Sequence, residues 1–256
     1  MLVHVFQSRR VCSLIRASRS CIIRLPVCCL AASDVAQAGR QAPTPAEGSE
    51  LFITFEGIDG CGKSTQIAIF EAMLKERGIS PLITQEPGGT RIGGAIRKIL
   101  LDVNNTQLTP LTELFLYEAD RAQHVSELIK PALEAGRWVI CDRYYDATTV
   151  YQGVVLQDSE ALIEQLNLEA CSRIIPELTF LLDCPAEVGL SRIEGRRRDE
   201  SEKDRFERKT LDFHTKIRYG YLALANKHKD RFTIIDSTLR KEHVARKIEE
   251  AISPYL

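Results

Sequence analysis

The chain has 256 residues, of which 44% are hydrophobic and 27% are charged, and its formal net charge is −1. This composition predicts a soluble globular protein that folds as one large domain or two small ones. No apolar run approaches the roughly 18 residues of a membrane-spanning helix, so we expect no membrane insertion. Residues 51–256 carry a charge of −4, which excludes a polybasic nucleic-acid binder, and we expect no nucleic-acid partner.

The N-terminal segment differs from the rest of the chain. Residues 1–33 hold five arginines and five serines but no Asp or Glu, which is typical of an organellar transit peptide. A disordered tail, an upstream mis-start and a secretory signal are the alternatives, and Arg24 argues against the last because it interrupts the apolar run. Residues 34–50 are small, polar and Pro-containing, as in a linker. We therefore predict a transit peptide and linker without fixed structure at 1–49 and a folded domain at 50–256. The expected destination is a mitochondrion or plastid, and otherwise the cytoplasm.

The folded part begins with an apolar, strand-like run at 51–55 and continues into a glycine-rich loop. The loop fits the pattern G-x-x-x-x-G-K-[ST], and a helix-like segment follows it. In such a loop the backbone N–H groups and the helix N-terminus face nucleotide phosphates. Lys63 would reach the β- and γ-phosphates, and the Ser64 hydroxyl would join the Mg²⁺ shell. The flanking strand and helix favour a nucleotide-binding loop over a chance turn. Its residues are Gly57, Ile58, Asp59, Gly60, Cys61, Gly62, Lys63, Ser64 and Thr65.

The cysteines indicate neither a disulfide framework nor a zinc site. Four of the eight lie in the N-terminal segment, and Cys61, Cys141, Cys171 and Cys184 are far apart, with no C-x-x-C spacing. Cys61 lies near a helix N-terminus, where the pKa of a thiol can fall. A reactive thiol is therefore one interpretation, and a small residue that fits the loop is the favoured one.

Strand-like and helix-like segments alternate along the whole folded part. The strand candidates are near-continuous apolar runs, as expected for a parallel sheet covered on both faces. They lie at 51–55, 81–85, 138–141, 178–182 and 232–235. Helical patterns lie at 64–77, 93–101, 111–135, 159–172, 186–195, 203–227 and 240–253. The alternation predicts one α/β domain with a doubly wound, parallel, five-stranded sheet, whose ligands bind beyond the carboxyl ends of the strands.

Informative residues follow the second and third strand candidates. The sequence EPGGT begins at Glu86, and DRYYD begins at Asp142 and leads to the sequence YQG. Asp142 is a carboxylate at a strand end, where it can hold Mg²⁺ indirectly, through groups that are bound to the ion. The guanidinium group of Arg143 is planar and always charged, which suits it to bind an acceptor phosphate. A local salt bridge between the two is the alternative.

The phosphate loop, EPGGT and DRY…YQG together resemble the thymidylate kinases, which belong to the P-loop nucleoside monophosphate kinases. The resemblance runs from about Leu51 to the C-terminus and also includes 176–190, 204–207 and 213–214. Gly60 and the basic residues after Arg192 resemble the bacterial subgroup. The resemblance implies the reaction ATP + dTMP → ADP + dTDP, with Mg²⁺ held by Ser64 and Asp142, and a homodimer. Catalysis would rest on positioning and charge neutralisation by Lys63, Asp142, Arg143 and lid arginines.

The resemblance also implies roles for substrate-binding residues. Tyr117 matches a Phe that stacks on thymine, Arg121 and Gln152 match residues that read the base, and Thr148 matches a Ser near it. Asp59 would face the sugar 3′-OH or the acceptor phosphate. The whole substrate set is Asp59, Glu86, Pro87, Tyr117, Arg121, Arg143, Thr148 and Gln152. The alternatives are a core aromatic at Tyr117, a solvated helix face at Arg121 and a helix-cap-like loop residue at Asp59.

A charge-dense segment near 192–205 resembles the mobile lid of the family. Arginine side chains that close over the phosphates stabilise the charge on the transferring phosphoryl group and exclude water. The alternative is a solvated face, which is the more common role of a run of charged residues. The arginines are Arg192, Arg196, Arg197, Arg198 and Arg205, of which the three consecutive ones are the catalytic candidates.

Two positions depart from the family pattern and leave the base preference open. Gln85 stands where the family commonly has Arg, and Tyr117 replaces Phe. One alternative function is a kinase for another pyrimidine monophosphate, namely dUMP, UMP or CMP. Another is a nucleotide-binding module without turnover. A GTPase is disfavoured because the chain lacks an N-K-x-D signature.

Overall fold

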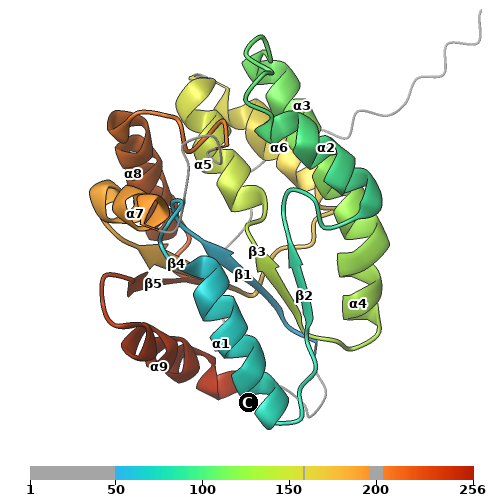
Figure 1. The fold of residues 1–256 in the computed structure, drawn as a ribbon. Helices are drawn as coiled ribbons and strands as arrows, with labels where there is room; N and C mark the ends of the chain where they lie inside the picture. Colours follow the sequence, from blue (N-terminus) through green and yellow to red (C-terminus); the bar gives the residue numbers. More distant parts are fainter. Residues whose placement is uncertain (1–49, 158, 196–203) are drawn as a thin grey trace, which may run out of the picture. The chain divides into compact units, whose positions relative to one another are not determined.

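The computed structural model describes residues 50–157, 159–195 and 204–256. In this part of the chain one sheet contains five parallel strands in the order β2-β3-β1-β4-β5 (Figure 1). The strands are β1 (Phe52–Glu56), β2 (Leu82–Gln85), β3 (Val139–Asp142), β4 (Leu178–Asp183) and β5 (Phe232–Asp236). The predicted doubly wound α/β fold is confirmed, and each strand lies within one residue of its predicted bounds.

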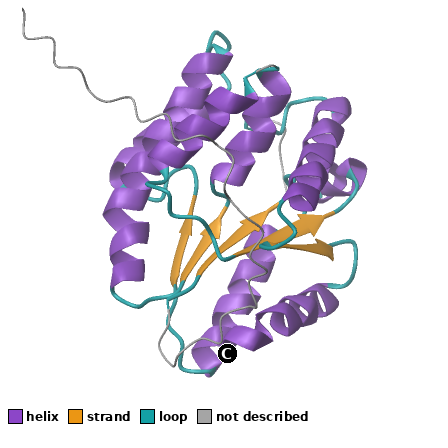
Figure 2. Ribbon diagram, turned by 180° about the vertical axis from the view of Figure 1, so that it is seen from behind, coloured by secondary structure: helices purple, strands orange, loops and turns teal. Residues whose placement is uncertain are grey.

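Helices cover both faces of the sheet (Figures 1 and 2). Successive side chains of a strand point to opposite faces, so Phe52 and Phe55 mark the two sides. Phe55 packs with Phe70 of α1, and α9 lies beside α1. Phe52 packs on the other face with Val125 and Ile129. Burial on both faces explains why the strands are apolar at nearly every position.

The helices agree with most of the predicted helical ranges. They are α1 (Lys63–Glu76), α2 (Arg91–Leu101), α3 (Pro110–His124), a π-helix (Val125–Ile129), α4 (Lys130–Glu134), α5 (Tyr145–Val155), α6 (Glu160–Ala170), α7 (Ala186–Glu194), α8 (Leu211–Lys227), α9 (Lys241–Ile252) and a final 3₁₀ turn (Ser253–Tyr255). None of the helices in the described residues is long and apolar enough to cross a membrane.

Two predicted helical ranges differ from the structure, and one helix was not predicted. The range 111–135 is interrupted by a π-helical turn at Val125–Ile129. The range 203–227 starts later, at Leu211, because the Thr210 side chain accepts a hydrogen bond from the Phe213 N–H and caps the helix. Helix α5 was not predicted, since its β-branched residues and Gly153 have low helix propensity. Burial of one side of α5 overrides that propensity.

Candidate active site

The phosphate loop connects β1 to α1 and folds back on itself. Gly57 and Gly60 have positive φ angles of 134° and 75°. A Cβ atom would lie 2.5 Å from the Leu182 carbonyl oxygen at the first and 2.0 Å from the Gly189 carbonyl oxygen at the second. Only glycine fits both the backbone conformation and the space at these two positions. The loop therefore lies directly against the end of β4 and against helix α7.

Lys63 opens helix α1 and lies inside the curl of the loop. Its Nζ atom donates hydrogen bonds to the Gly57 and Ile58 carbonyl oxygens, both at 3.2 Å. These contacts hold the ammonium group where the loop amides and the helix N-terminus converge, a suitable place for an anion. The phosphate contact of Lys63 stays a prediction.

Cys61 is a buried residue within the loop. Burial raises the pKa of the Cys61 thiol above its ordinary value, and the nearby Lys63 only partly offsets this effect. The interpretation of Cys61 as a low-pKa reactive thiol is therefore wrong. Its position agrees with a small side chain that fills the loop.

A cavity of about 300 Å³ opens over the loop at the carboxyl ends of β1 and β3. The two strands are neighbours in the sheet, which brings Asp142 to the loop. The Ser64 hydroxyl donates a hydrogen bond to Asp142 Oδ2 at 3.4 Å. We call this space the phosphate cavity; it is lined by Asp59, Gly60, Gly62, Lys63, Ser64, Gln85, Glu86, Arg97, Asp142, Arg143, Ile193, Asp204 and Glu207.

Arg143 crosses from the end of β3 towards the phosphate loop. Its guanidinium donates to Asp59 Oδ1 at 2.6 Å, to the Gly57 carbonyl oxygen at 3.0 Å and to the Tyr221 hydroxyl at 3.1 Å. Burial alone would raise the pKa of Asp59, but Arg143 and Lys63 hold that pKa below its ordinary value. The local ion pair of Arg143 is therefore with the loop residue Asp59, whereas the sequence suggested Asp142.

A second cavity, of about 90 Å³, adjoins the first. We call it the base cavity, and it contains all eight predicted substrate residues. Asp59, Glu86, Arg97, Arg143 and Asp204 line both cavities, so the two spaces meet there. The base cavity is lined by Asp59, Glu86, Pro87, Arg97, Leu101, Tyr117, Arg121, Arg143, Tyr144, Ala147, Thr148, Tyr151, Gln152, Asp204 and Phe206.

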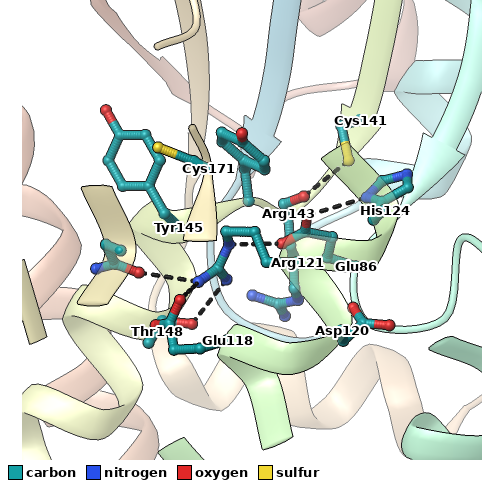
Figure 3. A network of polar contacts seen from close by, with 12 residues as sticks. Glu86, Glu118, Asp120, Arg121, His124, Cys141, Arg143, Tyr145, Thr148 and Cys171 are labelled. Carbon is teal, nitrogen blue, oxygen red and sulfur yellow. Dashed lines mark hydrogen bonds and ion pairs between the residues drawn. The ribbon is translucent and has the colours of Figure 1, made fainter. Parts of the chain in front are cut away.

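Arg121 lies at the centre of a buried polar network behind the base cavity (Figure 3). The residue is 1% exposed, so the alternative of a solvated helix face is wrong. Its guanidinium donates to Glu86 and Glu118 at 3.0 and 2.8 Å, and to Asn167 and Thr148 at 2.9 and 2.8 Å. These bonds occupy four of the five guanidinium hydrogens and leave one for a ligand.

Tyr117 and Gln152, which the sequence also predicts to contact the base, line the same cavity. The Tyr117 ring is partly buried and lies 6.4 Å from the Phe206 ring, centroid to centroid. Burial raises the pKa of the Tyr117 phenol. The Gln152 side chain donates to Glu113 Oε1 at 2.9 Å. Tyr117 is thus an aromatic wall of the cavity, and Gln152 is oriented by a buried carboxylate.

Several cavity residues were not assigned from the sequence, among them Arg97, Tyr151 and Phe206. Arg97 on α2 donates to the Pro87 carbonyl oxygen at 2.7 Å and lines both cavities. Its one sequence signal is the spacing of four residues from Gly93, which places both on one helix face. Tyr151 lies within the quoted sequence YQG and Phe206 within the range 204–207, and their aromatic rings pack edge to face.

The lid arginines fall into two groups. Arg196, Arg197 and Arg198 lie outside the described residues. Arg205 donates to the Leu100 carbonyl oxygen at 3.0 Å, pairs with Glu113 and lies over the Phe206 ring. Arg192 donates to the Ser237 carbonyl oxygen at 2.9 Å. Together with Leu239 it lines a third cavity, of about 250 Å³, beside the phosphate loop.

The parallel α/β fold and the phosphate loop between β1 and α1 are those of a P-loop nucleoside monophosphate kinase. The family model for thymidylate kinase matches residues 55–248. Thymidylate kinases of Trichlorobacter lovleyi and Geobacter sulfurreducens are 49% and 47% identical to the chain. These alignments cover 79% and 78% of this chain, and 96% and 95% of those proteins.

A crystal structure of thymidylate kinase from Ehrlichia chaffeensis is also similar, with a TM-score of 0.62 and 29% identity. The match covers 80% of this chain and 99% of that one. The chain belongs to the thymidylate kinase family. It is an ATP-dependent enzyme that phosphorylates dTMP to dTDP.

Proposed function

We propose that dTMP occupies the base cavity and that the ATP phosphates occupy the phosphate cavity. The observation that carries this proposal is the set of residues shared by the two cavities. Asp59, Arg97 and Arg143 line both spaces, which is where the acceptor phosphate must meet the γ-phosphate. Two bound substrates would then face each other without a large rearrangement of the described residues.

The proposed mechanism relies on positioning and on charge neutralisation. A dTMP phosphate oxygen attacks the γ-phosphorus, and the bond from that phosphorus to the β–γ bridging oxygen breaks as ADP leaves. Lys63 neutralises charge on the donor side and Arg143 on the acceptor side, where charge spreads over the phosphoryl oxygens. The attacking oxygen is already ionised, so no general base is required.

We also propose a Mg²⁺ site at Ser64 and Asp142. The fit rests on the donor set, because a hydroxyl and a carboxylate lie 3.4 Å apart at the phosphate cavity and both are oxygen ligands. In the described residues no group of three or more His, Cys, Asp or Glu side chains is arranged to hold a metal. An ion that keeps its waters and binds phosphate oxygens needs no such group. When bound there, Mg²⁺ would supply positive charge that offsets the negative charge of the transferring phosphoryl group.

Recognition of thymine would combine stacking with hydrogen bonding. We propose that Tyr117 provides the stacking face and that the remaining guanidinium hydrogen of Arg121 meets a base carbonyl. Gln152 and Thr148 complete the polar edge, and Glu86 and Pro87 also line the cavity. Thymine differs from uracil by one methyl group, which an apolar pocket rewards by roughly 1–3 kcal/mol. Preference for dTMP over dUMP should therefore be moderate.

The third cavity suits the adenine ring of ATP. It lies beside the phosphate loop and combines the flat Arg192 guanidinium with the apolar Leu239 and Val244. We propose that Arg196, Arg197 and Arg198 act as the lid over the transferring phosphoryl group. The lid role of these three arginines rests on the family resemblance and on their charge.

A homodimer is the proposed assembly. Helices α2 and α3 pack side by side on the outside of the fold (Figure 1). They expose Ile92, Ile99, Leu111 and Phe115, each between 44% and 50% accessible. Exposed apolar side chains on two adjacent helices are typical of a protein interface. A second copy of the chain can cover them symmetrically.

The N-terminal residues 1–49 are proposed to direct the enzyme to an organelle. Their acid-free, Arg-rich and Ser-rich first 33 residues support this proposal. Cytoplasmic localisation is the alternative.

A substrate panel tests the proposed function. ADP release is measured for the purified enzyme with dTMP, dUMP, UMP and CMP at saturating ATP and Mg²⁺. We expect kcat/KM to be highest for dTMP, with dUMP next. Equal activity on CMP and dTMP would show that Tyr117, Arg121 and Gln152 do not read thymine.

A further inference from the structure

The hydroxyl of Tyr221 joins a buried carboxylate to the guanidinium of Arg143. Tyr221 lies on α8, is 1% exposed and packs its ring against Tyr151. Its hydroxyl donates to Glu56 Oε2 at 2.7 Å and accepts from Arg143 Nη1 at 3.1 Å. A phenol has one hydrogen to give, and a guanidinium only donates, so the direction of both bonds is determined.

The carboxylate of Glu56 contacts two groups that adjoin Arg143: the backbone of Tyr144 and the hydroxyl of Tyr221. Glu56 is the last residue of β1, is fully buried and immediately precedes the phosphate loop. One carboxylate oxygen accepts the backbone N–H of Tyr144 at 2.8 Å, and the other accepts the Tyr221 hydroxyl. The carboxylate thus fixes the backbone next to Arg143 directly and its side chain through Tyr221.

Arg143 needs such support because its backbone conformation is unfavourable. Its φ angle is 68°, in the left-handed region, which is strained for a non-glycine residue. The Arg143 N–H donates to the Phe55 carbonyl oxygen at 3.0 Å, and its carbonyl accepts from the Cys141 thiol. These two hydrogen bonds hold the backbone of Arg143 in this conformation.

We propose that Tyr221 is a positioning residue for Arg143, which it holds towards the acceptor phosphate. The proposal rests on the proposed phosphate-binding role of Arg143. Two of the Nη1 partners of the guanidinium are the Gly57 carbonyl oxygen and the Tyr221 hydroxyl. Without the hydroxyl, Nη1 keeps only the first of these, and the guanidinium is held by that bond and by the Nη2 ion pair with Asp59.

The ionisation of Glu56 gives this arrangement a pH dependence. Burial and the nearby Asp146 raise the pKa of Glu56 to about 7, while Arg143, the Tyr221 hydroxyl and the Tyr144 N–H lower it. Arg231, which forms an ion pair with Asp146, is a further charged group close to Glu56. Protonation removes the negative charge that anchors Tyr221 and Arg143. The value of kcat/KM for dTMP should therefore fall as the pH drops through about 7.

Tyr221→Phe is the test, because it removes one oxygen and keeps the ring. Tyr219→Phe, on the same helix but 61% exposed, is the matched control. We expect Tyr221→Phe to raise the KM for dTMP by roughly 3- to 10-fold, as for the net loss of one ordinary hydrogen bond. The KM for ATP should change by less than about 2-fold. The control should behave as the parent.

The pH profile separates positioning from a purely structural effect. Loss of the hydroxyl removes a group that lowers the pKa of Glu56, so the acid limb of kcat/KM for dTMP should move to higher pH in Tyr221→Phe. Glu56→Gln should flatten that limb. The dTMP phosphate titrates near pH 6 in every variant, so only differences between variants carry information. A structural defect would lower the whole profile without moving it, and that result would overturn the proposal.

Arg143→Ala distinguishes failure of this inference from failure of the proposed role. If Arg143→Ala leaves the KM for dTMP unchanged, both the phosphate contact and the positioning role are rejected. If Arg143→Ala raises that KM while Tyr221→Phe matches the parent at every pH, only the positioning role is rejected.

Discussion

Replacing Arg121 by Met should destabilise the protein strongly, because the change leaves buried charge without a partner. Glu86 and Glu118 pair with this guanidinium, and their side chains are only 3% and 8% exposed. Breaking a buried ion pair by removing one partner costs roughly 3–5 kcal/mol. For a domain of this size each kcal/mol shifts Tm by about 2–4 °C, so we expect Tm to fall by about 6–20 °C.

Thermal unfolding of the full chain measures this effect, with a matched control. Arg173→Met removes an exposed partner of Glu169, and surface pairs are worth only about 0–1 kcal/mol. Adding Glu118→Gln to Arg121→Met should recover part of the loss because it removes one stranded charge. A Tm for Arg121→Met within 2 °C of the parent, in a scan where about 6 °C or more is expected, would refute the reasoning.

The same variant should show a defined pH dependence of stability. Burial raises the pKa of Glu118, and Arg121 opposes that rise. Without Arg121 the pKa of Glu118 rises further above 4.5. A carboxyl group with a raised folded-state pKa stabilises the fold below its unfolded-state pKa, and that contribution is lost as pH rises through the folded-state pKa. The deficit of Arg121→Met should therefore be larger at pH 8 than at pH 5.

Four further changes test other parts of the molecule. Lys63→Ala should lower kcat by at least about 10²-fold with unchanged circular dichroism, and near-normal turnover would reject the ATP site. Tyr117→Ala should raise the KM for dTMP but not for ATP, whereas Tyr117→Phe should be tolerated; equal effects of both would argue against stacking. Phe115→Asp should shift the mass in light scattering from dimer to monomer, and Tyr219→Asp should not. Deleting residues 1–48 should leave kinase activity intact and abolish organellar import of a tagged enzyme, and a truncated protein that fails to fold would contradict this.

Local patterns were sufficient to predict the sheet and the phosphate loop. The strands are continuous apolar runs because both faces of the sheet are covered, and the loop has glycines where the backbone needs them. Lys63, Ser64 and Asp142 follow or end strands of one parallel sheet, and such sheets bind ligands beyond the carboxyl ends of their strands. The proximity of these three residues was therefore predictable.

Features that depend on tertiary contacts were not predictable in the same way. Helix α5 forms against its own propensity, because burial of residues such as Val150 and Tyr151 stabilises it. The partners of Arg121 come from four separate segments, so no spacing in the sequence reveals that this side chain is buried. Arg97 is held at the cavity by its hydrogen bond to the Pro87 carbonyl oxygen, and no sequence motif predicts this contact.

The carbonyl oxygen of Gly57 receives hydrogen bonds from both Lys63 and Arg143. One backbone atom thus lies between the donor side and the acceptor side of the reaction. If the phosphates of ATP draw the Lys63 ammonium away from this oxygen, the oxygen becomes a stronger acceptor for Arg143 and steadies it before dTMP arrives. Such an effect is a coupling free energy, and it is reciprocal: dTMP would strengthen ATP binding by the same factor. The enzyme would then favour the ternary complex over either binary complex.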